Sequence, residues 1–430
     1  MCAAFRYGNL RELYAACPEL PEKGDVSLLA RPVAGEGFVC KNAIAIQPME
    51  GCDGTTDGAP GEWTMRRYKR FAAGGAGLVW AEAISVVPEG RANPYQLMLT
   101  KENLGEFRRL TDAMREEAAK NGEQAPVMIA QLTHSGRWSR PVQEKEPIRM
   151  WTSPVLDPHQ GLPDDYPIAT DEYLASLPER FAASTRLARE AGFDGVDVKA
   201  CHLYLYSEML GAFNRPGPYG GSFENRIRLF LESIDAARSE IAGGILASRI
   251  NLYDGSAAGW GVGENLETDL AEPMLLLDKM WEHGVKLFNI TMGTPYFNPH
   301  VNRPYCNGGY VPPEDPLKGV ARLLSGCAEA QKRLPDAVCL ATGLSYLREF
   351  APEIAAGMAA RGEAKLFGFG RGAFAYPDLA RDICEKGKME HEKCCVTCSL
   401  CTKIMRAGGK PGCPVKDTEW YLPEYRRVIK

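Results

Sequence analysis

The stretch "ATDEYLASLPERFAASTRLAREAGFDGVDVKA", residues 169–200, contains the unit from which the fold follows. Its first part follows a threonine, spaces apolar residues three and four apart and stops at Gly192, which is typical of an amphipathic helix. The apolar run "GVDVKA" comes next. A short, nearly continuous apolar run is typical of a strand that is covered on both faces, as parallel strands are. The stretch therefore predicts a helix that leads into a parallel strand.

The same unit recurs along the chain. Apolar runs alternate with helical patterns, and the eight runs are "NAIAIQPM", "GLVWAEAI", "PVMIAQL", "GVDVKA", "ILASRIN", "KLFNITM", "AVCLAT" and "AKLFGFG". Eight such alternations predict an α/β fold with a single closed (β/α)8 TIM barrel. We expect residues 36–385 to form this barrel. Residues 1–35 would be an N-terminal extension with a short helix, and residues 386–430 a cysteine-bearing tail.

Composition excludes several classes of function. The chain has 430 residues, 45% hydrophobic residues and a net charge of −5, which does not indicate a nucleic-acid partner. No apolar run approaches the roughly 18 residues that a membrane span requires, and the N-terminus lacks a secretory cleavage pattern. We therefore expect no membrane contact and a cytoplasmic protein.

Polar residues follow most of the expected strands. TIM barrels build their active sites at the carboxyl ends of the strands, so these residues are site candidates. One such end, "VDVKACHLYLYSEM" (residues 196–209), places a lysine, a cysteine, a histidine and a tyrosine directly after a buried strand. The candidates are Pro48, Met49, Glu50, Glu82, Ala83, Gln131, His134, Lys199, His202, Tyr204, Arg249, Thr291, Thr342, Gly343, Gly370 and Arg371.

The last two strand ends predict a phosphate site. "ATGLS" and "GFGRG" combine glycines, free backbone N–H groups and Arg371 where TIM barrels often bind phosphate. Gln131 can both donate and accept hydrogen bonds, and Arg249 adds a fixed positive charge. An isoalloxazine ring needs both, because its pyrimidine edge alternates donors and acceptors and its reduced form gains negative charge.

These motifs carry a family resemblance. "NAIAIQPME", "GLVWAEAI", "IAQLTHSGR", "GFDGVDVKACHLYL", "GPYGGSFENRIRLFLE" and "FGFGRG" resemble the Old Yellow Enzyme family of FMN-dependent ene-reductases, over roughly residues 36–385. The tail resembles the iron–sulfur branch that contains 2,4-dienoyl-CoA reductases and enoate reductases. The resemblance implies that the FMN ring contacts Pro48, Met49, Ala83, Gln131 and Arg249. It implies that the phosphate binds to Gly343, Ser345, Gly370 and Arg371.

The resemblance also implies roles at the fourth strand end. Lys199 and His202 would hold the activating oxygen of a substrate while its conjugated C=C bond is reduced, and Tyr204 would supply the proton. His300 is a second candidate for proton donor. Lys199 departs from the histidine that the family has at this position. It could instead be a structural ion-pair partner of Asp197 or Glu82.

The tail predicts a metal site. Its spacing, Cys395-x2-Cys398-x2-Cys401-x11-Cys413-Pro, indicates a [4Fe–4S] cluster. Structural zinc is the alternative, although zinc sites usually have two separate Cys-x2-Cys pairs. Cys394 is an alternative first ligand, because the related branch usually has one more residue between its second and third cysteines.

Two other functions stay open at this point. Lys199 could form a Schiff base in a class I aldolase-type lyase, with a sugar phosphate at the last two strand ends. Alternatively, the chain could be a flavin and iron–sulfur electron-transfer subunit. The sequence does not choose among steroid enones, enoyl thioesters and aryl acrylates as substrates. We expect the electrons to come from NAD(P)H or from a redox partner protein such as a flavodoxin or ferredoxin, and the oligomeric state is undetermined.

Overall fold

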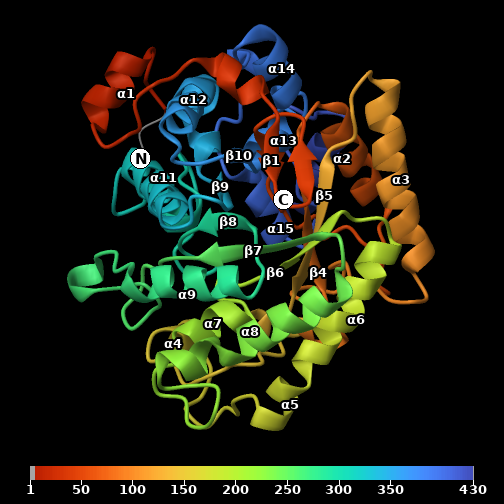
Figure 1. Cartoon of the computed structure of the whole chain (residues 1–430), viewed down its shortest axis with the longest axis vertical. Helices are drawn as coiled ribbons and strands as arrows, with labels where there is room; N and C mark the ends of the chain where they lie inside the picture. The colour runs from red at the N-terminus through yellow and green to blue at the C-terminus, as the bar shows by residue number, and fades with distance from the viewer. Residues whose placement is uncertain (1–4, 430) are drawn as a thin grey trace.

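The computed structural model describes residues 5–429, and its centre is a closed barrel of parallel strands (Figure 1). Each strand pairs with its sequence neighbours, and β10 closes the barrel against β3. This arrangement confirms the predicted TIM barrel. The strands are β3 (Ile44–Ile46), β4 (Leu78–Ser85), β5 (Val127–Thr133), β6 (Gly195–Val198), β7 (Ile245–Asn251), β8 (Leu287–Thr291), β9 (Val338–Ala341) and β10 (Leu366–Phe369).

Helices surround the barrel. The longer ones are α2 (Glu62–Ala73), α3 (Leu104–Lys120), α6 (Leu177–Glu190), α8 (Phe223–Glu240), α9 (Ala271–Glu282), α11 (Pro316–Arg333), α12 (Ala351–Arg361) and α14 (Leu379–Lys386). Shorter helices lie in the connections: α4 (Leu156–Gln160), α5 (Asp171–Ala175), α7 (Leu205–Leu210), α10 (Pro299–Asn302) and α13 (Arg371–Ala375). The helix expected after Thr170 is therefore split into α5 and α6 at Ser176.

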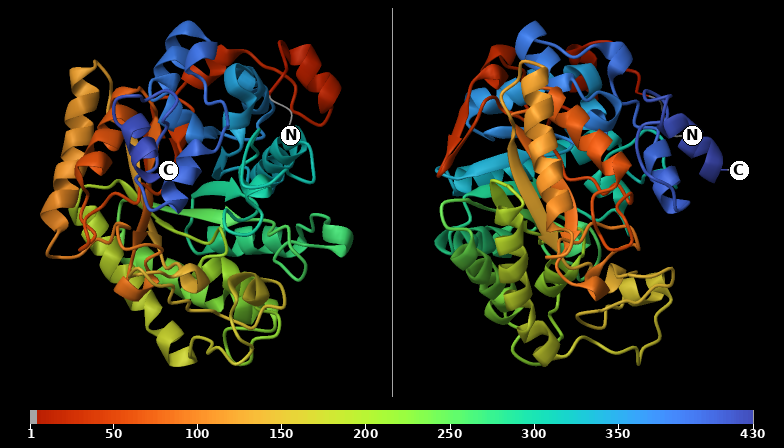
Figure 2. Two further views of the ribbon diagram at one scale, coloured as in Figure 1. Left: turned by 180° about the vertical axis from the view of Figure 1, so that it is seen from behind. Right: turned by 90° about the vertical axis from the view of Figure 1, so that its right-hand side faces the viewer.

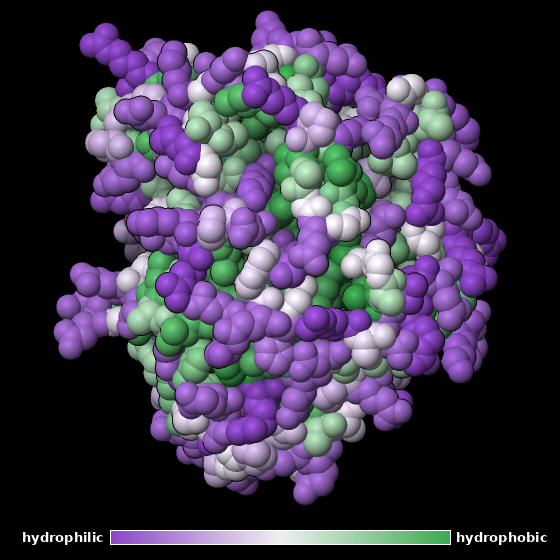
Figure 3. Space-filling view, in the orientation of Figure 1, coloured by the Kyte–Doolittle hydropathy of each residue, from purple (hydrophilic) through white to green (hydrophobic). Residues whose placement is uncertain are grey.

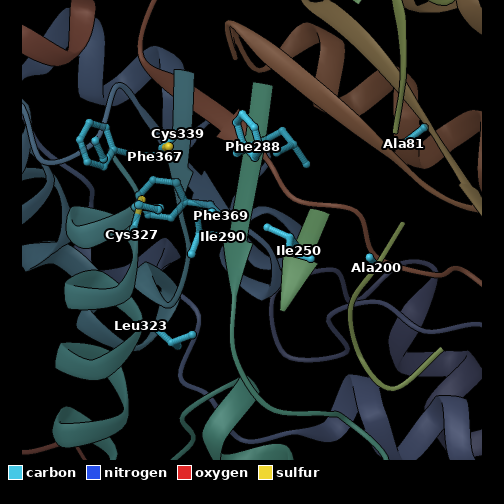
Figure 4. Close-up of a cluster of buried hydrophobic side chains, with 14 of the residues drawn as sticks. Ala81, Ala200, Ile250, Phe288, Ile290, Leu323, Cys327, Cys339, Phe367 and Phe369 are labelled. Carbon is cyan, nitrogen blue, oxygen red and sulfur yellow. The ribbon is translucent and has the colours of Figure 1, made fainter. Parts of the chain in front are cut away.

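Local sequence explains where several helices begin. The Ser222 side chain accepts a hydrogen bond from the Asn225 N–H and caps α8. Asp315 caps α11 in the same way, and Pro316 follows at the first helical position. The apolar face of α11 then packs on the barrel. Figure 4 shows Cys327 of this helix beside Phe369 of β10, with Leu323 further along the helix.

The barrel interior has an apolar floor. Side chains alternate along each strand, so one set faces the helices and the next faces the barrel axis. The inward set at the amino ends of the strands is apolar and includes Ala45, Trp80, Ile129, Leu287 and Leu366. A two-stranded antiparallel hairpin, β1 (Val33–Gly35) and β2 (Phe38–Cys40), packs against this set. The hairpin was not predicted, and the expected boundary at residue 36 falls in its turn.

The N-terminal extension contains the helix α1 (Leu10–Ala16), as expected, and a 3-10 helix at Val26–Ala30. The tail contains α15 (Leu400–Arg406) and α16 (Tyr421–Val428). Its anchor is buried Asp417, which accepts a hydrogen bond of 2.7 Å from Arg66 of α2 and a second from Arg70. The right-hand view of Figure 2 shows the tail on the same side of the barrel as the yellow segment that follows β5.

The surface is mixed. In Figure 3 hydrophilic side chains cover most of the face shown, and hydrophobic ones gather toward its middle. Among the described helices, none is long and apolar enough to cross a membrane.

Candidate active site

A cavity of about 620 Å³ opens at the carboxyl ends of the strands. It lies where the inward set of side chains changes from apolar to polar. On β5, Ile129 is followed two positions later by Gln131, and on β7 Ala247 is followed by Arg249. The predicted site residues that line this cavity are Pro48, Met49, Glu50, Gln131, Lys199, His202, Tyr204, Arg249, Thr342, Gly343, Ser345, Gly370 and Arg371.

Asp197 organises one wall of the cavity. Its carboxylate accepts hydrogen bonds from Trp80 Nε1 (2.8 Å), Gln131 Nε2 (2.6 Å) and the Arg249 backbone N–H (2.8 Å). Burial raises the pKa of Asp197 to about 6, and these donors oppose the shift. The contact fixes the Gln131 amide, so its oxygen and second N–H remain available to a ligand.

Several buried polar atoms in the lining have no hydrogen-bond partner within the described chain. They are Gln47 Nε2, Arg249 Nε, Thr342 Oγ1 and Arg371 Nη1. Buried polar groups are normally hydrogen-bonded, so such a concentration points to a polar ligand. FMN fits this set, because it presents acceptors on both its ring and its phosphate.

The floor beneath this wall is held by amide contacts and by a glycine. Asn289 Nδ2 donates to Gln47 Oε1 at 2.8 Å. A Cβ atom at Gly368 would lie 2.0 Å from Gln47 Nε2, so a side chain at this position would displace the Gln47 amide. Gly368, the first residue of "GFGRG", therefore keeps the cavity open near β10.

The ends of β9 and β10 form the predicted phosphate region. Gly343 has a φ of +97°, a left-handed conformation that favours glycine. The Gly372 N–H at the start of α13 donates to Ser345 Oγ at 3.0 Å. Arg371 Nη2 donates to the Pro304 carbonyl at 2.6 Å, which leaves Nη1 unpaired. A glycine turn and an arginine with an unpaired Nη1 thus lie where the sequence predicted a phosphate.

Lys199 and Tyr204 pack together at the end of β6. Lys199 Nζ lies 3.5 Å from the centroid of the Tyr204 ring. No carboxylate oxygen of the described residues lies within 4.0 Å of Lys199, so neither of the ion pairs considered for it, with Asp197 or Glu82, is present. Burial is the main cause that lowers the pKa of Lys199, and Glu50 opposes the shift.

The Tyr204 hydroxyl belongs to a short hydrogen-bond chain. It donates to Glu50 Oε1 at 2.7 Å and lies 2.7 Å from the hydroxyl of Tyr296. Burial raises the pKa of Tyr204 well above its ordinary value, and the Glu50 carboxylate raises it further. Tyr204 therefore stays protonated at neutral pH, with its hydroxyl at the cavity.

His202 is held as a neutral imidazole. Burial lowers its pKa well below the ordinary value, and the Arg249 and Lys199 charges add to the shift. Asn302 Nδ2 lies 3.1 Å from His202 Nε2 and also donates to the Met292 carbonyl, which identifies Nδ2 as the donor. His202 Nε2 is thus an acceptor, so Nδ1 carries the proton. The φ values of His202 (+68°) and Leu203 (+56°) show that this turn is strained.

Five of the predicted barrel candidates do not line the cavity: Glu82, Ala83, His134, Thr291 and His300. Ala83 is buried in β4, and its carbonyl accepts a hydrogen bond from Gln96 at 3.2 Å. His300 is in α10, where its Nδ1 lies 2.6 Å from the Tyr310 hydroxyl. Neither residue lines the cavity, which gives His300 no direct approach to a ligand bound there.

The predicted metal ligands surround a second, much smaller hollow of about 20 Å³. Cys395, Cys398, Cys401 and Cys413 all line it, whereas Cys394 is buried beside it and does not. Within residues 5–429, no three His, Cys, Asp or Glu side chains are grouped closely enough to hold one metal ion. Four thiols around one hollow are nevertheless the donor set that an iron–sulfur cluster uses.

Sequence reasoning missed several lining residues. Tyr296, Asn302 and Arg303 come from the β8 connection, and Trp138 follows β5. The Trp138 and Tyr296 rings stack with centroids 4.5 Å apart and planes at 12°. Glu50 was noted at its strand end without a role. No spacing in the sequence links these positions, because they meet only when the loops fold over the mouth.

Known proteins match this chain in sequence. Residues 31–292 match the NADH:flavin oxidoreductase / NADH oxidase family. The NADPH dehydrogenase of Geobacillus sp. (strain WCH70) is 30% identical over 272 residues, which cover 62% of this chain and 73% of that protein. The NADPH dehydrogenase of Halalkalibacterium halodurans is 29% identical over 296 residues, with 68% and 80% covered.

Solved structures share the fold. A 2-naphthoyl-CoA reductase in complex with 2-naphthoyl-CoA superposes with a TM-score of 0.72 at 20% identity, over 93% of this chain but only 58% of that protein. An old yellow enzyme homologue from Zymomonas mobilis has a TM-score of 0.63 at 20% identity, over 85% and 94%. From the family match over most of the barrel, we conclude that this chain belongs to the NADH:flavin oxidoreductase / NADH oxidase family of Old Yellow Enzyme-type, FMN-dependent oxidoreductases.

Proposed function

We propose that the protein reduces a C=C bond conjugated to a carbonyl or carboxyl group. The observation that carries this proposal is the meeting of two groups of residues in one cavity. Gln131 and Arg249 suit the FMN ring, and Lys199, His202 and Tyr204 lie beside them. When FMN is bound, its reduced ring supplies the hydride that adds to the β-carbon.

The chain's own residues then have separate tasks. Lys199 and His202 donate hydrogen bonds to the activating oxygen and stabilise the negative charge that develops on it. Tyr204 gives its hydroxyl proton to the α-carbon. Because Tyr204 shares a 2.7 Å hydrogen bond with Tyr296, the lost proton can be replaced through the second hydroxyl. One hydride and one proton thus saturate the bond.

The cofactor would be held at both ends. Arg371 and the N–H groups after β9 and β10 would bind the phosphate, with Gly343, Ser345 and Gly370 leaving room for it. Pro48 and Met49 would contact the ring from the end of β3. The family assignment favours this role over an aldolase with a Schiff base on Lys199.

We also propose a [4Fe–4S] cluster on Cys395, Cys398, Cys401 and Cys413. Cys401, Arg371 and Phe374 line both the large cavity and the cysteine hollow, so a cluster there would lie next to the flavin site. Electrons would reach the flavin from NAD(P)H or, through the cysteines, from a redox partner protein. An electron-transfer subunit would have the same path for electrons but would not reduce an unsaturated substrate.

The test is an anaerobic absorbance spectrum of the purified protein with flavin, iron and zinc analysis, followed by mixing of the reduced enzyme with an enone and an enoate. We expect FMN at about one per chain and reoxidation of the flavin with formation of the saturated product. FAD, or a protein without flavin, would contradict the proposal. A flavin that no unsaturated compound reoxidises would favour the electron-transfer role.

A further inference from the structure

Lys199 is a buried charge without a partner. The residue is only 3% exposed, and its ammonium group faces the Tyr204 ring at 3.5 Å. It makes no hydrogen bond and no salt bridge to any residue between 5 and 429. A contact with an aromatic ring offsets only part of the cost of removing an ammonium group from water. An anionic ligand in the cavity would compensate the remaining cost.

The other buried charged groups of the described lining have partners or tasks. Arg137 is paired with Asp157 at 2.7 Å and with Glu208 at 2.6 Å. Under the proposed function, Arg249 faces the flavin ring and Arg371 the phosphate. Glu50 is the one carboxylate among the described lining residues, and it accepts its hydrogen bond from Tyr204. Of the remaining cations of the described lining, Arg140 donates to the Gln143 carbonyl and Arg303 to Thr402 Oγ1, both at 2.7 Å, whereas Lys145 and Arg406 are exposed. After the cofactor is bound, Lys199 is therefore the buried cation of this lining that still lacks a partner.

A second donor lies close to Lys199. Because Asn302 occupies Nε2 of His202, the imidazole N–H is at Nδ1 and has no partner among the described residues. A carboxylate has two oxygens and can accept from both an ammonium and an imidazole N–H. A ketone has one oxygen and no charge to neutralise Lys199. The stacked rings of Trp138 and Tyr296 add a flat, largely apolar wall to the same cavity.

We infer that the substrate is an anionic enoate whose free carboxylate is bound by Lys199, with a flat apolar group such as an aryl ring attached to the double bond. This inference rests on the proposed function and narrows it from carbonyl compounds in general to unsaturated acids. Lys199 thereby becomes the residue that selects acids over esters, ketones and thioesters.

Binding to the oxidised FMN enzyme tests the inference without turnover. The probes are trans-cinnamate and methyl trans-cinnamate, which share a skeleton and differ in charge, and binding is followed by the flavin absorbance. We expect the wild type to bind the acid at least about 10-fold more tightly than the ester, since a charge-assisted hydrogen bond is involved. Lys199→Met should lose about 10- to 100-fold for the acid and less than about 3-fold for the ester.

Two further variants separate charge at this position from charge elsewhere. Lys199→Arg keeps the positive charge and should keep the preference for the acid. Lys318→Met removes an exposed lysine of α11 and should change neither affinity. Equal binding of acid and ester by the wild type would overturn the inference, and this comparison needs no variant. A preference that survives in Lys199→Met would overturn it as well.

The proposed function can fail separately. If the acid binds in a Lys199-dependent way but neither probe reoxidises the reduced flavin, the reduction is wrong and the anion site stands. If the ester reoxidises the flavin as fast as the acid at equal concentration below saturation, the reduction stands and the selectivity is overturned.

Discussion

The cavity at the strand ends and the cysteine hollow share a wall, yet they are built from different kinds of segment. The cavity measures about 620 Å³ and is formed by strand ends, whose backbones are fixed by the barrel. The hollow measures about 20 Å³ and is formed by a loop, one turn of α15 and the segment around Cys413. The shape of the cavity therefore follows from the barrel, whereas that of the hollow follows from segments outside the barrel.

The groups that would bind the ligand also differ in protonation between the two sites. Burial raises the pKa of Cys395 to about 11 and that of Cys413 to about 12, so both thiols carry protons at neutral pH. Thiolates are the metal ligands, so assembly of the proposed cluster would release protons. In the barrel, by contrast, the donors for FMN already carry the hydrogen atoms that they would share.

The largest expected effect is on the cysteine site. Cys398→Ala should abolish the iron content while FMN stays at about one per chain, because the barrel does not depend on the cluster for its shape. Cys384→Ala is the matched control, since this cysteine lies on α14 outside the hollow. Iron and flavin analysis of the purified variants measures both. Full iron in Cys398→Ala, or zinc in the wild type, would contradict the cluster.

The variant Tyr204→Phe tests whether Tyr204 in the cavity donates the proton to the product. Removal of the hydroxyl should slow protonation of the product by about 100-fold, as expected when a general acid is lost. The measurement is stopped-flow reoxidation of the reduced flavin, with solvent deuterium incorporation at the α-carbon. Tyr206→Phe removes a neighbouring buried hydroxyl that contacts Ser233 and should leave the rate within about 2-fold. Equal rates in wild type and Tyr204→Phe would show that another group donates the proton.

Arg371→Ala probes the shared wall. The variant should weaken FMN retention by about 2 kcal/mol, or roughly 30-fold in Kd, because a charged partner of the phosphate is lost. Equilibrium dialysis of the apoprotein with FMN measures this change. Arg361→Ala, at the end of α12, provides a surface control. Unchanged affinity for FMN together with altered iron content would assign Arg371 to the cysteine site instead.

The smallest effect concerns His134, which is buried directly after β5 and lines neither the cavity nor the hollow. Burial lowers the pKa of His134 to about 3, so its imidazole stays neutral in the folded protein at a pH near 6.5, where the unfolded chain begins to bind the proton. Its stabilising contribution is complete above pH 6.5 and decreases as the pH falls toward 3. Between pH 7.5 and 5.5 the wild type should lose about 1.4 kcal/mol more unfolding free energy than His134→Gln. Urea titrations at both pH values measure this difference. Equal losses of unfolding free energy in the two proteins would show that water reaches His134.

Much of the site was predictable from alternation along the strands. Alternate residues of a strand share one face, and the inward face includes positions 129 and 131, 197 and 199, and 247 and 249. The sequence of each strand therefore indicates which side chain it places at the mouth of the barrel. The same rule would have identified Gln47 and Asn289, and it would have given Asp197 a place in the wall beyond that of an ion-pair partner for Lys199. Glycines after β9 and β10 likewise marked the phosphate region.

The sequence by itself determined the barrel and the polar ends of its strands, because period-two and helical patterns are local and each strand follows its own pattern. Only the tertiary structure decided how residues from different loops meet. It brought Tyr296 and Glu50 to Tyr204 and Asn302 to His202, it left Lys199 without a counter-ion, and it directed His300 toward Tyr310 instead of the cavity. These contacts join residues about 10 to 150 positions apart, and no local pattern records them, since loop paths depend on the packing of the whole mouth.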